Sequence, residues 1–178
     1  MSSVVSQGPA RGAGSPAAAS RKALALADRL EQGAKALAAF AAAMSDAEWQ
    51  SQMPKDGRRL GTIVHHVASV YPIEVELAAT VAGGQAVTGV TWDTIHQMNG
   101  AHAAEHPSPA KAATIDLLRR NSAEAADAIR ALTDEQLDRA MPVSIYGDAP
   151  LTSQFVLEDH AVRHAYHHLS KLRALLAR

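Results

Sequence analysis

The densest cluster of potential metal ligands lies near the C-terminus, in the stretch Asp159–Leu172. His160, His164 and His168 recur at every fourth residue, and His167 directly precedes the last of them. Side chains four residues apart on an α-helix project from the same side, with Cβ atoms about 5–6 Å apart. Two such imidazoles can bind one metal ion. The spacing alone allows either the pair His160/His164 or the pair His164/His168.

A second pair of histidines, His65 and His66, lies in the upstream stretch LGTIVHHVASV. Its apolar periodicity predicts a helix from about Leu60 to Val81. His66 falls at the edge of the apolar face, and His65 points nearly opposite, toward solvent. We predict that one histidine of this helix joins two of the C-terminal helix around a divalent ion, which would leave positions open for water or substrate. The competing interpretation is that these histidines are surface or hydrogen-bonded boundary residues.

Other residues have two possible roles. His102 and His106 are also four residues apart, which allows a second metal site, but we favour a solvated crossover helix. His96, Asn99 or His102 could line a pocket if this crossover covers the mouth of a bundle. Glu74 and Glu158 fall on apolar faces and could accept an imidazole N–H. For both carboxylates we favour the alternative: a kink at Pro72 turns Glu74 outward, and Glu158 lies in a solvated first turn.

Composition excludes several function classes. The chain has 178 residues and a formal charge of -1, so it lacks the basic excess of nucleic-acid-binding proteins. Cysteine is absent, which removes protein thiolates as nucleophiles or ligands and is consistent with a reducing compartment. We therefore predict a cytoplasmic protein. No apolar stretch is long enough for a signal peptide or a membrane span, so no membrane association is expected.

The pattern of caps and apolar periods predicts an all-α domain over residues 20–178, after a disordered tail at 1–19 rich in Ser, Gly, Ala and Pro. Short capped helices follow Ser45 and Thr133, and a small extended excursion follows Met141-Pro142. The longer helices are expected from Ser20 to Met44, Leu60 to Val81, Trp92 to His106, Pro109 to about Leu132, and Thr152 or Ser153 to the C-terminus.

Two of these stretches resemble motifs of the DinB-like superfamily, also called DinB/YfiT-like metalloenzymes. LGTIVHHVASV is similar to the family's second-helix motif, in which an apolar stretch leads into a histidine followed by an apolar residue, here His66-Val67. HAYHHLSKL resembles its last-helix motif, two histidines separated by three residues and usually followed by Arg-Gly-Gln. Leu169-Ser170-Lys171 replaces that ending here. The resemblance covers most of residues 22–178.

The resemblance implies a four-helix bundle with a long crossover between helices two and three, and the metal ligands His66, His164 and His168. It further implies nickel, zinc or a similar divalent ion, a homodimer and, in some members, a low-molecular-weight thiol such as mycothiol or bacillithiol as cosubstrate. We accordingly expect a metal-dependent enzyme that activates a thiol or water toward a small-molecule substrate, with no catalytic residue assigned. The alternative is a non-catalytic helical bundle that binds a metal or a protein partner.

Overall fold

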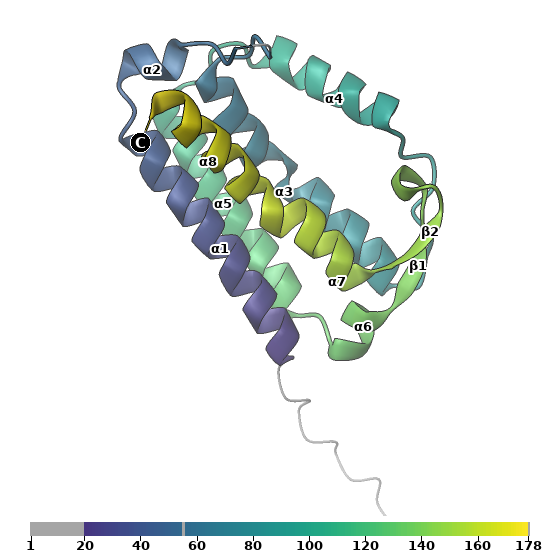
Figure 1. Ribbon diagram of the computed structural model, residues 1–178. Coiled ribbons are helices and arrows are strands. Elements are labelled where there is room, and N and C mark those ends of the chain that lie inside the picture. The colour runs from purple at the N-terminus through teal and green to yellow at the C-terminus, as the bar shows by residue number, and fades with distance from the viewer. Residues whose placement is uncertain (1–19, 55, 178) are drawn as a thin grey trace, which may run out of the picture.

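Four long helical segments pack side by side in the computed structural model, which describes residues 20–54 and 56–177 (Figure 1). They are α1 (Arg21–Ala42), α3 (Leu60–Ala82), α5 (Lys111–Arg130) and a C-terminal segment made of α7 (Ser153–Val156), a π-helical stretch (Leu157–Val162) and α8 (Arg163–Leu176). Both α1 and α3 pack on α5 and on the C-terminal segment, so α1 and α3 are diagonally opposite. This confirms the predicted all-α four-helix bundle. The predicted tail, 1–19, lies outside the described residues.

The long helices form where the sequence has an apolar stripe and a capping residue. In α1, Leu26, Leu30 and Leu37 are fully buried at helical spacing. Ser20 caps this helix, because its hydroxyl accepts the backbone N–H of Ala23 at 3.0 Å. Helix α5 begins two residues later than predicted, at Lys111, and its N-cap residue Ala110 makes no side-chain capping bond. The hydroxyl of Ser108 donates to Gln50.

Two short capped helices have equivalent places in the two halves of the chain. These are α2 (Asp46–Gln50), which follows α1, and α6 (Asp134–Asp138), which follows α5; both have the predicted capping box. After α6 the chain forms the antiparallel hairpin of β1 (Ala140–Val143) and β2 (Ala149–Thr152), with Ala140 opposite Thr152. A 3-10 turn, η1 (Ser144–Tyr146), connects the two strands. The hairpin leads into α7, which Thr152 caps.

The crossover between α3 and α5 carries helix α4 (Trp92–Glu105), as predicted. Thr91 caps α4 with a capping box, and none of the helix's own residues is buried. In Figure 1, α4 lies outside the four packed helices, between the α2 end of the molecule and the hairpin. The crossover helix is therefore an attached element that contributes little to the bundle core.

Helix α3 runs unbroken through Pro72, so that the residues before and after this proline lie on one helix. Within residues 20–54 and 56–177, no helix combines the length and the apolar character that crossing a membrane requires.

A candidate metal centre

The imidazoles of His66, His164 and His168 converge between α3 and α8. One ring nitrogen from each lies within 4.8 Å of those of the other two. The ring centroid of His66 is 5.0 Å from that of His164 and 5.7 Å from that of His168. His66 is buried and the other two are half-buried. The three residues that the family resemblance implies as ligands are thus neighbours, and metal binding by them is a prediction taken up below.

His160 lies within the π-helical stretch Leu157–Val162, whereas His164 and His168 lie on α8. Because α8 is regular, His164 and His168 stack with their ring planes 27° apart and centroids 4.9 Å apart. A π-helical turn has i→i+5 hydrogen bonds, so His160 and His164 do not keep the regular four-residue relationship. Nε2 of His160 instead lies 3.1 Å from the hydroxyl of Tyr146, which donates its proton to Asp159.

Glu74 supports the site from the same helix as His66. Its Oε1 accepts a hydrogen bond from Nδ1 of His164, and the side chain is buried. The expectation that Pro72 would turn Glu74 outward is wrong, because α3 stays helical there. Since Nδ1 of His164 is occupied, Nε2 is the nitrogen left to bind a ligand. Glu158 pairs with Arg29 at 2.7 Å and is partly exposed, so it fits the solvated interpretation.

Burial disfavours the charged form of two of the three imidazoles. It lowers the pKa of His66 to about 3, with a smaller contribution from the neighbouring His164. Burial likewise lowers the pKa of His168 to about 2, followed by the effects of His164 and His66. Neutral imidazoles have a free lone pair at pH 7. Nδ1 of His66 is buried without a hydrogen-bond partner in the described part of the chain, which is unfavourable unless something binds there.

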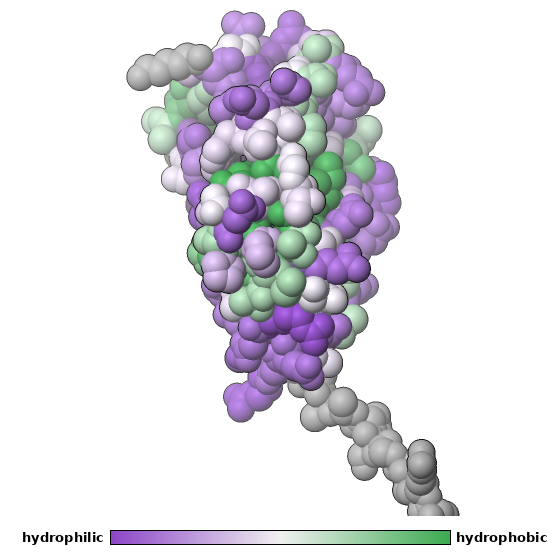
Figure 2. Space-filling view, turned by 90° about the vertical axis from the view of Figure 1, so that its right-hand side faces the viewer, coloured by the Kyte–Doolittle hydropathy of each residue, from purple (hydrophilic) through white to green (hydrophobic). Residues whose placement is uncertain are grey.

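The three imidazoles and Glu74 lie in the wall of a cavity of about 560 Å³. Most of the remaining lining is apolar, and it includes Trp92, Ile95 and Met98 of α4. Figure 2 shows the side of the molecule where α4 and the hairpin lie, with hydrophobic residues inside a recess surrounded by more hydrophilic ones. This volume and character suit a small organic molecule. Of the crossover residues considered from the sequence, Asn99 lines this cavity, whereas His96 is exposed.

Sequence reasoning missed two further contacts made by residues of the cavity wall. The first joins Asp159 and His160, which line the cavity, to Tyr146, and it exists only because the β1–β2 hairpin folds back onto the C-terminal segment. The second is that of Arg58, which binds Asp56 through both carboxylate oxygens, at 2.5 and 2.6 Å. This pairing lowers the pKa of Asp56 and raises that of Arg58. No local motif marks either contact.

The fold of the chain is similar to the folds of two solved structures. The solved structure of YfiT from Bacillus subtilis, described as a probable metal-dependent hydrolase with an unusual four-helix bundle topology, has a TM-score of 0.69 at 17% identity, covering 93% of this chain and 94% of that one. The mycothiol-dependent maleylpyruvate isomerase has a TM-score of 0.65 at 13% identity, covering 84% of this chain but 60% of that one. At these identities the matches establish the fold alone.

The search among curated proteins found no significant match. The sequence model of the DinB superfamily, in contrast, matches residues 29–172. That range includes α3 with His66, the whole crossover, and His164 and His168 on α8. The chain therefore belongs to the DinB superfamily.

Proposed function

We propose that this chain is a metal-dependent enzyme in which His66, His164 and His168 hold a divalent ion, nickel or zinc, at the wall of a substrate cavity. The observation that carries the proposal is the meeting of three imidazole nitrogens within 4.8 Å of one another beside a cavity of about 560 Å³. Three protein nitrogens with an open side facing a cavity are the donor set typical of catalytic rather than structural zinc sites.

The residues present fit such an ion. Nδ1 of His66 has no partner in the described part of the chain, and Nε2 of His164 is left available by the bond to Glu74. A divalent ion bound by neutral ligands lowers the pKa of a coordinated water or thiol and polarises a carbonyl oxygen. Glu74 fixes the tautomer and orientation of His164, and the cavity wall beside it is largely apolar.

The nucleophile is either water or a low-molecular-weight thiol. The chain has no cysteine, so a thiol must come from a cosubstrate such as mycothiol or bacillithiol. The two structural relatives support one chemistry each, since one is described as a hydrolase and the other as mycothiol-dependent. The largely apolar cavity favours a small substrate with an apolar body. No side chain of the chain is assigned as a general acid or base.

The test is metal content and turnover of protein purified without a histidine tag. Elemental analysis should find nickel or zinc, and the loaded protein should either hydrolyse members of an ester and amide panel or consume mycothiol or bacillithiol together with an electrophile. His168→Ala should abolish both the turnover and binding at this centre. His167→Ala, one residue away and exposed, is the matched control for metal content.

Turnover that survives His168→Ala, or protein that binds no ion at this centre, would contradict the proposal. Tight metal binding without turnover across the panel would favour the non-catalytic bundle instead. The cytoplasmic location and the homodimer stay predictions, and light scattering of the purified protein tests the second.

A further inference from the structure

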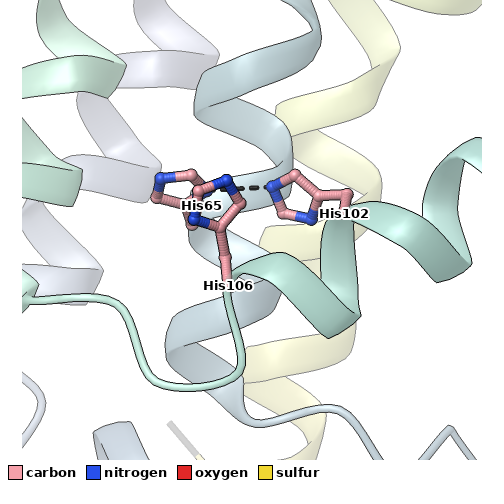
Figure 3. A group of neighbouring side chains, drawn as sticks. All are labelled: His65, His102 and His106. Atoms are coloured by element: carbon pink, nitrogen blue, oxygen red, sulfur yellow. Dashed lines mark hydrogen bonds between the residues drawn. The ribbon is translucent and has the colours of Figure 1, made fainter.

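A second histidine cluster joins the crossover helix to the bundle. His65 of α3 faces His102, on the last turn of α4, and His106, the residue that ends α4 (Figure 3). The ring centroid of His65 is 5.1 Å from that of His102 and 4.1 Å from that of His106. The rings of His102 and His106 are 4.9 Å apart. All three side chains are half-buried, so the expectation that His65 points toward solvent is wrong.

We propose that His65, His102 and His106 bind a second divalent transition-metal ion, and that this ion clips α4 onto α3. One ring nitrogen from each histidine lies within 4.8 Å of those of the other two. Nδ1 of His65 is 2.9 Å from Nε2 of His102. Two nitrogens bound to a tetrahedral zinc ion at about 2.0–2.1 Å are about 3.3 Å apart, so a small movement of two side chains suffices to admit an ion.

The hydrogen bonds within the cluster leave one buried ring nitrogen without a partner among the described residues. It is Nδ1 of His102, whereas Nε2 of the same ring is the nitrogen that faces His65. The bond between His65 and His102 uses one nitrogen from each ring, and Ser69 also approaches Nδ1 of His65, at 3.2 Å. Three imidazoles form a donor set for zinc, nickel, cobalt or copper rather than for magnesium or calcium. The carboxylate of Glu105 is 3.9 Å from Nε2 of His106.

The position of the cluster indicates what the ion would do. No residue of α4 itself is buried, and its end is held to α3 by the bond from the Thr62 hydroxyl to the carbonyl of His106, at 2.9 Å. Trp92, Ile95 and Met98 of the same helix line the large cavity. An ion held by one histidine of α3 and two at the end of α4 would therefore fix one wall of that cavity. This role does not depend on the function proposed above.

Ion stoichiometry separates the two centres. Tag-free protein is stripped with a chelator, dialysed against zinc or cobalt, and analysed for bound metal. We expect two ions per chain in the unmodified protein. The double variant His102→Gln/His106→Gln and the double variant His164→Gln/His168→Gln should each keep one. His96→Gln, an exposed histidine of α4, is the control and should keep two.

The same four proteins also show which centre binds when only one ion is found per chain. If only the His65 cluster binds, the unmodified protein holds one ion and His102→Gln/His106→Gln holds none. If only the His66 centre binds, the unmodified protein also holds one ion, but His102→Gln/His106→Gln keeps it and His164→Gln/His168→Gln holds none. That last pattern overturns the second site and leaves the proposed function intact.

Hydrogen exchange tests whether the ion attaches α4 to α3. In the His164→Gln/His168→Gln background, adding zinc should slow amide exchange along α4, because the ion joins this helix to α3. The slowing should disappear when His102→Gln and His106→Gln are added. Zinc that binds at the cluster without changing the exchange of α4 would overturn the structural role. Circular dichroism of the stripped variants verifies that each of them folds.

Discussion

Glu74 of α3 and His164 of α8 are joined by a hydrogen bond across the helix interface, although 90 residues separate them in the chain. The carboxylate is buried, and its second oxygen has no partner in the described part of the structure. A buried carboxylate is unfavourable unless its surroundings stabilise it. The contact with an imidazole that is itself a predicted metal ligand supplies that stabilisation and orients the ring.

The first prediction concerns this bond. Glu74→Gln keeps the shape of the side chain but removes its charge, so the imidazole of His164 becomes less basic and less firmly oriented. Affinity for zinc at the His66 centre should fall by about 10–100-fold. A competition titration against a coloured chelator measures the change. Glu76→Gln, exposed on the same helix, should leave the affinity unchanged. Equal affinities of the two variants would show that Glu74 does not act on the ion.

The second prediction settles which histidines of the C-terminal segment are ligands. His160 contacts the hydroxyl of Tyr146 and lies in the π-helical stretch rather than on α8. His160→Gln should therefore retain the ion of the His66 centre, while His164→Gln should lose it. Metal analysis and competition titration provide the comparison. Loss of that ion in His160→Gln would instead assign His160 to the coordination sphere.

The third prediction is a pH dependence of stability. Burial, followed by the hydrogen bond to Asp159, raises the pKa of Tyr146 above its usual value near 10. Above pH 10 the unfolded chain therefore releases this proton more readily than the folded protein does. The contribution of Tyr146 to stability is fully present below pH 10 and is lost as the pH rises from there toward the raised pKa.

Urea unfolding at a series of alkaline pH values measures this effect. The free energy of unfolding should fall with pH above 10 more steeply for the unmodified protein than for Tyr146→Phe. Buried Tyr71, whose pKa is also raised by burial, contributes equally to both proteins and cancels in the comparison. Parallel curves for the two proteins would show that Tyr146 ionises alike in the folded and unfolded states.

The fourth prediction concerns the start of α3, the helix that carries His66. A methyl group at Gly61 would lie 2.4 Å from Cε2 and 2.5 Å from Nε1 of the Trp49 indole. Trp49 is buried, and its Nε1 donates to the carbonyl of Pro109 at 2.9 Å, so the ring cannot move away freely. Gly61→Ala should lower the free energy of unfolding by about 1–3 kcal/mol, as overpacking does elsewhere.

The matched control for this variant is Gly100→Ala on α4, where nothing lies within 4 Å of the new methyl group. It should leave the free energy of unfolding unchanged or raise it by up to about 1 kcal/mol. Urea denaturation of both variants tests the pair. Equal stabilities would mean that the indole of Trp49 moves aside without cost.

Much of the fold could be predicted because its signals are local. Ser20, Thr91 and Thr152 each cap the helix that follows, as their residue types and positions indicated. The start of α5 was predicted too early. Ser108 has a suitable side chain for a cap and is followed by proline, but the helix begins only after Ala110. The hydroxyl of Ser108 donates to Gln50, and a contact with so distant a residue leaves no trace in the local pattern.

The sequence by itself determined which helices form, which of their faces are apolar, and that histidines four residues apart share one side of the last helix. It also placed His66 at the edge of a buried face, because helical periodicity gives the direction in which each side chain leaves the helix axis. Only the tertiary structure decided which residues meet across helices. Periodicity gives the direction of a side chain relative to the axis of its own helix. It does not say which residues of other helices lie in that direction. For this reason His65 was expected to face solvent and instead faces His102 and His106 of the crossover helix, while Glu74 faces His164.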